Sequence, residues 1–173
     1  RAAPGGYVLL AAPSVLNAGQ IQADGGAIGL ASAARVAIDM SGAGLVRFSV
    51  DGAVLGAAVA NSGTVQADGG TVTLQARALG DALATVVNQT GVVRARSAVE
   101  RDGQIVLSGG TTGVVRAGGT IDASGALAGK TGGRVEVLGD KVAVMPDARI
   151  DASGSAGGGT VLVGGDWQGG AAA

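Results

Sequence analysis

Hydrophobic and polar residues alternate along this chain in many short runs, each bounded by Gly, Asp, Asn or Ser. Examples are QIQAD at 20–24, TVTLQA at 71–76 and RVEVLG at 134–139. Strict alternation over a few residues is typical of a β-strand with one buried face. The pattern therefore predicts an all-β chain of short strands joined by tight corners.

The runs also repeat. The phrase IDASG occurs at 121–125 and again at 150–154, 29 residues later. Aligning similar phrases on an inward alanine gives five copies, at Ala23, Ala67, Ala95, Ala123 and Ala152. Each copy reads as a strand of type Ile/Val-x-Ala-Asp/Ser, a glycine-rich corner of variable length, and a second strand of type Val-x-Leu/Val. A period of this size predicts one coil of a solenoid per repeat.

In such a solenoid Ile121 stacks on Ile150, in parallel and in register, at a strand spacing of about 4.8 Å. The outward neighbours then form a column along the stack, made of Gln22, Gln66, Arg94, Asp122 and Asp151. Parallel pairing through short corners predicts a parallel β-helix rather than a doubly wound sheet. Small inward residues fit this prediction because opposite walls of each coil pack closely.

Two segments interrupt the alternation, at 51–61 and 77–88. Apolar residues such as Leu79, Leu83 and Val86 fall at helical spacing. Each segment ends at an Asn that is soon followed by Gly, a common helix stop. We therefore expect one or two short helical insertions at corners of the coil.

Composition supports a folded, thin-cored chain. The 173 residues include 34 Gly, only 2% aromatic residues and 47% hydrophobic residues, with a net charge of −1. That hydrophobicity and low charge argue against disorder. Scattered basic residues predict no nucleic-acid partner, and no apolar run reaches the roughly 18 residues of a membrane span. We expect residues 1–173 to form a single β-helix segment of a longer protein.

Several phrases resemble a known family. They are NSGTVQADGGTVTLQA at 61–76, GTIDASG at 119–125, GGRVEVLGDKV at 132–142 and ARIDASGSAGGGTVLVGGDWQG at 148–169. In combination, over about 18–170, they resemble the large exoproteins of the filamentous-haemagglutinin type, which are two-partner-secretion adhesins of Gram-negative bacteria. The resemblance implies a right-handed parallel β-helix that is secreted to the cell surface through an outer-membrane partner transporter.

The sequence departs from that family in one respect. The amino-terminal secretion domain of the family carries Asn-Pro-Asn-Gly-type motifs, whereas Pro4, Pro13 and Pro146 are the only prolines here and none follows Asn. The resemblance thus implies that the transporter binds a region outside this chain. It further implies that the chain continues into adjacent coils of its parent.

The residues for most catalytic chemistry are missing. The chain has no His and no Cys, which excludes Ser-His-Asp and Cys-His machinery as well as His or Cys zinc sites. Asp122 and Asp151, expected one coil apart, leave three interpretations: a catalytic pair as in β-helix polysaccharide enzymes, a calcium bridge, or corner capping with Arg94 offsetting their repulsion. We favour the third, and predict no catalytic residue, no metal and no cofactor.

Other polar residues are expected at corners or on the surface. Asp24 and Asp68 are expected to cap the QAD-GG corners, and three asparagines to join turns or an internal polar ladder: Asn17, Asn61 and Asn88. Trp167 either stacks on a sugar or partner, or covers the side of a coil. The candidate surface-binding residues are Trp167, Arg94, Asp122 and Asp151.

These observations favour a structural and adhesive segment of a surface filament, without catalysis, whose partner is a host glycan or surface receptor. Two alternatives stay open: a β-helix polysaccharide-active enzyme, and the shaft of a toxin-delivery exoprotein. An ice-binding face would need a regular Thr-x-Thr column, which only Thr71–Thr73 approaches.

Overall fold

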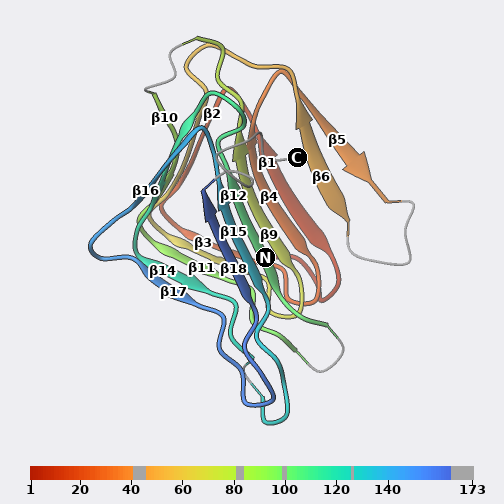
Figure 1. Ribbon diagram of the computed structural model, residues 1–173. Coiled ribbons are helices and arrows are strands. Elements are labelled where there is room, and N and C mark those ends of the chain that lie inside the picture. Colours follow the sequence, from red (N-terminus) through yellow and green to blue (C-terminus); the bar gives the residue numbers. More distant parts are fainter. Residues whose placement is uncertain (41–45, 81–83, 99–100, 126, 165–173) are drawn as a thin grey trace.

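A computed structural model describes residues 1–40, 46–80, 84–98, 101–125 and 127–164. The described residues are all-β, with eighteen strands and no helix. Sixteen strands form three parallel sheets, and the remaining two form an antiparallel hairpin (Figure 1). The prediction of an all-β chain built from parallel strands is confirmed.

The first sheet contains, in spatial order, β1 (Tyr7–Ala11), β4 (Ala27–Ser32), β9 (Thr71–Ala76), β12 (Gln104–Ser108), β15 (Arg134–Leu138) and β18 (Thr160–Gly164). The second contains β2 (Ser14–Asn17), β7 (Ala58–Asn61), β10 (Thr85–Gln89), β13 (Val114–Ala117) and β16 (Lys141–Val144). The third contains β3 (Gln20–Gln22), β8 (Thr64–Gln66), β11 (Val92–Arg94), β14 (Thr120–Asp122) and β17 (Arg149–Asp151). The hairpin is β5 (Arg35–Asp39) with β6 (Arg47–Asp51).

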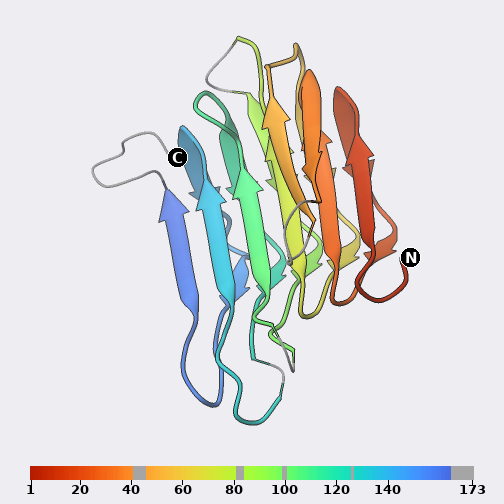
Figure 2. The ribbon, with the colours of Figure 1, turned by 90° about the vertical axis from the view of Figure 1, so that its right-hand side faces the viewer.

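The chain visits the three sheets in turn, so that successive coils stack along one axis (Figure 2). Each coil has three strands, whereas the sequence repeat showed two of them, those of the third and first sheets. The sequence repeat did not include the second-sheet strands because the corner before them varies in length. After β4, this corner contains the whole hairpin. The arrangement is solenoid-like.

The predicted register is confirmed. Ile121 pairs with Ile150 and Asp122 with Asp151. Four of the five repeat alanines are fully buried, and the fifth, Ala152, is half-buried in the last described coil. The core between the sheets consists of Val, Ile, Leu and Ala side chains, among them Ile28, Leu74, Ile105, Ile121 and Val137, all with no exposed surface.

The predicted helical insertions are wrong. Segment 51–61 contains the end of β6, a turn and β7. Segment 77–88 contains an isolated bridge and the start of β10. Residues 81–83, and therefore Leu83, lie outside the described part. Backbone bonds that a helix would make locally run between coils instead: Val54 N donates to Arg77 O (3.0 Å), and Leu79 N to Val54 O (2.9 Å). Leu79 is 59% exposed while Val86 is fully buried, so the helical spacing marks no common face.

Glycine at the corner before the first sheet permits the close stacking of coils. A Cβ on Gly70 would lie 2.1 Å from the carbonyl oxygen of Gly26. That oxygen accepts the Thr71 N–H at 3.0 Å, the bond that starts the pairing of β9. The same clash recurs two coils on, where a Cβ on Gly133 would lie 2.1 Å from Gly103 O. The requirement is for close backbone approach, not for a left-handed φ.

A buried amide ladder links three coils at the corner after the second sheet. Asn17 Nδ2 donates to Asn61 Oδ1 at 2.7 Å, and Asn61 Nδ2 donates to Gln89 Oε1 at 2.8 Å. Asn61 and Gln89 have no exposed surface. The predicted polar ladder is confirmed for Asn17 and Asn61. It is wrong for Asn88, which lies half-buried on the other face of β10, and the third member is Gln89.

We expect Gly70→Ala to lower the free energy of unfolding by about 2 to 3 kcal/mol, because the added methyl group must push two coils apart. Gly158→Ala is the matched control, since nothing lies within 4 Å of the added Cβ, and it should change stability by less than about 0.5 kcal/mol. Urea denaturation of both variants measures the difference. Equal stability of the two would contradict the close-approach explanation.

We expect Asn61→Ala to cost about 3 kcal/mol, because it leaves Asn17 Nδ2 and Gln89 Oε1 without the partners that they have here. The neighbouring variant Asn88→Ala should cost less than about 1 kcal/mol, since Asn88 stands outside the ladder. Thermal melts by circular dichroism compare the two. A larger loss at Asn88 than at Asn61 would show that the ladder contributes little.

Candidate functional site

The outward column predicted from the repeat is present on the third sheet. Cα register joins its five members in order: Gln22, Gln66, Arg94, Asp122 and Asp151. Trp167 lies outside the described residues. The structure therefore brings together three of the four candidate surface-binding residues, on adjacent strands of one sheet.

A second polar row follows two residues later, where each strand of the third sheet enters its corner. Asp24 Oδ1 accepts the backbone N–H of Asp68 at 3.2 Å, and Asp68 Oδ1 accepts that of Arg96 at 3.1 Å. The predicted capping role is confirmed, but each aspartate caps the corner of the following coil. These carboxylates therefore tie successive coils together.

Asp68 is the carboxylate of this row that is bound by two arginine side chains. Arg96 Nη2 donates to its Oδ2 at 2.6 Å, and Arg94 Nε lies 3.5 Å from its Oδ1. Burial pushes the pKa of Asp68 upward, but the hydrogen bonds from the side chain and backbone of Arg96, with the charges of Arg96 and Arg94, outweigh it. The pKa of Asp68 therefore lies below its ordinary value. The hydrogen bond that Arg96 donates to Asp68 raises the pKa of Arg96 in turn.

Asp122 and Asp151 bind their own corners. Asp122 Oδ1 accepts the backbone N–H of Ser124 at 3.0 Å and its hydroxyl at 2.6 Å, and Asp151 Oδ1 accepts the Ser153 N–H at 2.9 Å. The hydrogen bonds from Ser153 lower the pKa of Asp151. This geometry supports corner capping for the pair. Among the described residues, no three His, Cys, Asp or Glu side chains converge as a metal site would require.

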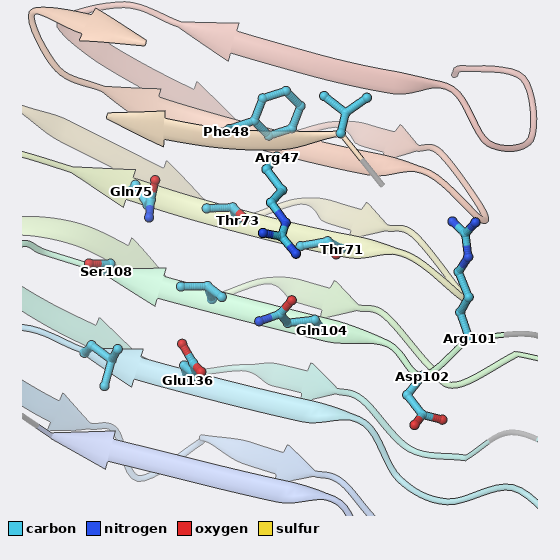
Figure 3. A pocket seen from close by; sticks show the side chains of 13 residues that line it. Arg47, Phe48, Thr71, Thr73, Gln75, Arg101, Asp102, Gln104, Ser108 and Glu136 are labelled. Carbon is cyan, nitrogen blue, oxygen red and sulfur yellow. The ribbon is translucent and has the colours of Figure 1, made fainter. Parts of the chain in front are cut away.

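A concave surface lies elsewhere, on the outer face of the first sheet. It is a groove of about 640 Å³ across β9, β12 and β15. Its floor carries outward side chains of these strands, chiefly the polar residues Thr71, Thr73, Gln75, Gln104, Ser108 and Glu136. Figure 3 shows them along three neighbouring strands.

The hairpin forms one wall of the groove. Phe48 of β6 packs where Gly29 of β4 has no side chain: a Cβ there would lie 2.6 Å from the ring. The same ring lies 6.1 Å from that of Tyr7, centroid to centroid. With the hairpin on its outer face, β4 is buried along its whole length. The coverage reaches β9, where Thr73 is also buried, and leaves the outer faces of β12 and β15 open as the groove.

Charged side chains stand at the wall and at one end of the groove. Arg47 extends from β6 toward Thr71 and Thr73, and Arg101 and Asp102 lie beside the corner that leads into β12 (Figure 3). Glu136, on the floor, forms an ion pair with Arg134. Thr131 Oγ1 donates to Asp102 at 3.3 Å.

Sequence reasoning predicted the strands that build this groove but not the groove. β5 and β6 also alternate in sequence, but their pairing into a hairpin over the sheet depends on tertiary contact. The available signal was the row of polar residues at outward positions of β9 and β12, which alternation alone assigns to solvent.

Comparison with known proteins gives no relative: no protein-family model matches the chain, and no curated protein matches it significantly. The resemblance to the filamentous-haemagglutinin type therefore stays a prediction. No helix in the described part of the chain is long and apolar enough to cross a membrane.

We expect Asp68→Asn to lower the free energy of unfolding by about 1 to 3 kcal/mol at pH 7, because the ionised carboxylate is held by Arg96 and Arg94. The folded pKa lies below the unfolded one, so this stabilisation is present above about pH 4 and is lost as the pH falls through the folded pKa. Urea denaturation at pH 7 and pH 2.5, in the presence of salt, measures it.

The control is Asp51→Asn, which removes an ion pair with Arg35 whose side chains are 72% and 79% exposed. Such a pair contributes about 0.2 to 1 kcal/mol. A deficit of Asp68→Asn that is the same at both pH values would show that the stabilisation does not depend on the ionised carboxylate.

Proposed function

We propose that this chain is a structural and adhesive segment of a secreted filamentous adhesin of the filamentous-haemagglutinin type, at the surface of a Gram-negative bacterium. The observation that carries the proposal is the stack itself. Three sheets of parallel strands pair coil to coil in register from β1 to β18. Such a stack extends in one dimension and holds binding surfaces along its length.

In this proposal the coils form a right-handed parallel β-helix, the hand that parallel strand connections favour. The inward residues of the last described strand support continuation into further coils of a parent chain: Val161 and Val163 are 44% and 47% exposed, whereas their partners Val135 and Val137 are fully buried. An additional coil would cover them. Export through a partner transporter belongs to the same proposal and involves regions outside this chain.

The adhesive part of the proposal draws support from the groove. It is concave, lined by both polar and apolar side chains, and built on a regular sheet, where a scaffold positions binding residues with little loss of conformational entropy. The corner-capping geometry of Asp122 and Asp151 favours a non-catalytic role over the polysaccharide-active enzyme. The toxin-delivery shaft shares every feature described here and differs only in what the shaft carries.

The experiment is a combined binding and turnover assay. The purified chain is tested against a panel of polysaccharides and host glycans, with and without calcium, while reducing ends and unsaturated products are monitored. We expect saturable binding, no product and no calcium dependence. Product release would favour the enzyme, and a complete lack of binding to the panel would remove the adhesive part of the proposal.

A further inference from the structure

The antiparallel hairpin has one free edge. β6 lies against β4 and β9, and β5 is the outer strand (Figure 1). Among the described residues, no further strand joins this two-stranded sheet. An edge strand presents unpaired N–H and C=O groups that can bind another strand, and native proteins block such edges with proline, bulges or charges. β5 contains no proline, pairs with β6 without irregularity, and is charged only at its two ends.

The alternation of the backbone decides which groups of β5 point to that edge. Ala34 N donates to Gly52 O at 3.0 Å. In an antiparallel pair, residues that bond to the partner strand alternate with residues whose N–H and C=O groups point the other way. The even-numbered residues of β5 therefore bond to β6. The N–H and C=O groups of Arg35, Ala37 and Asp39 point to the free edge.

The sequence of this edge is complementary to itself. β5 reads Arg-Val-Ala-Ile-Asp. If two copies pair antiparallel around Ala37, Arg35 of each copy lies opposite Asp39 of the other. Val36 then lies opposite Ile38, and the outward backbone groups of one edge meet those of the other. Opposite charges and apolar side chains that face each other across two strands stabilise a sheet.

The hairpin already uses this pairing. β6 reads Arg-Phe-Ser-Val-Asp, so that its Asp51 lies opposite Arg35 and its Arg47 opposite Asp39. Arg35 and Asp51 form an ion pair at 3.3 Å. A second copy would extend this row across four strands in the order Asp51, Arg35, Asp39 and Arg47, of which the last two belong to the second copy. The charges of the extended row alternate in sign.

Ile38 gives an independent observation. Its side chain is large, apolar and 39% exposed. It shares a face of the hairpin with Phe48, its partner in the register, which packs on the first sheet at Gly29. Val36 of a second copy would lie opposite Ile38 and cover part of it. The contact would therefore remove apolar surface from water as well as pair charges.

We propose that β5 pairs antiparallel with β5 of a second copy of this chain, giving a four-stranded sheet with a two-fold axis between the two Ala37 residues. Because both copies use the same strand, the interface closes on itself and forms a dimer. Two short strands bury less than the roughly 1,200 Å² of a stable interface, so a single contact is weak. Where many copies stand close together, such contacts add up. The pairing is independent of the proposed adhesive function, because it needs no glycan.

The test measures self-association of the whole chain by sedimentation velocity, from micromolar to millimolar protein at low salt. We expect a monomer–dimer equilibrium that weakens as salt is added. Arg35→Asp should weaken dimerisation at least about tenfold, because it places two carboxylates opposite each other at both ends of the contact. Asp39→Arg should do the same with two guanidinium groups.

An equimolar mixture of these two variants should restore dimerisation. Each end of the contact then pairs an acidic residue of one variant with a basic residue of the other, which only the antiparallel register around Ala37 provides. Mixing cannot repair a misfolded hairpin, so recovery in the mixture separates the contact from folding. Arg116→Asp is the matched control, because it reverses the same charge at an exposed position of β13. It should leave dimerisation unchanged.

Ala37→Pro tests the backbone of the contact. The Ala37 N–H points to the free edge, so proline removes a donor at the centre of the dimer and leaves the bonds to β6 in place. We expect dimerisation to be lost, while the thermal melt stays close to that of the original chain. Thermal melts of every variant verify folding, which the exposed positions of Arg35, Ala37 and Asp39 should leave intact.

Three results would overturn the inference: a monomer at every concentration, a mixture of the charge variants that fails to associate, or dimers that survive Ala37→Pro. Association that none of these substitutions alters would place the contact at another edge, such as that of β18, and would overturn it too. The glycan assay gives the same answer in either case, so failure of the pairing and failure of the adhesive function are distinguishable.

Discussion

The structure depends on one constraint: within the three parallel sheets, each interior strand hydrogen-bonds to the strands one coil before and one coil after it, at a spacing near 4.8 Å. The residue at each position of a strand must therefore fit against the residues at the equivalent positions of the neighbouring strands. Inside, this selects side chains such as Ile121 on Ile150 that stack without crowding. At the corner before the first sheet it selects glycine, because a Cβ on Gly70 would collide with the carbonyl of Gly26.

The same constraint explains how polar residues are tolerated in a thin solenoid. An amide that both donates and accepts can bind a copy of itself one coil away, so Asn17 and Asn61 remain paired while buried. Carboxylates lack the donor and instead cap backbone N–H groups or bind arginine, as Asp68 does with Arg96. The rows on the third sheet are thus primarily structural, and the open surface lies on the first sheet.

The groove arises where the repeat is interrupted. A hairpin inserted between β4 and β7 folds back over the first sheet, and Gly29 lets Phe48 dock on it. The hairpin covers β4 and brings Arg47 over β9. Regular coils supply the floor of the groove, and the irregular insertion supplies its wall.

The sequence by itself determined the strands of the first and third sheets, the in-register repeat, the outward column and the capping aspartates, because alternation and periodicity are local properties that parallel stacking copies from coil to coil. Only the tertiary structure decided that 51–61 and 77–88 are extended, since their backbone partners lie in other coils. It also decided that Gln89 rather than Asn88 joins the ladder, because an irregularity between Thr85 and Val87 shifts the register of β10. The groove belongs to this second class: its wall and floor are separate in the chain and meet only through packing.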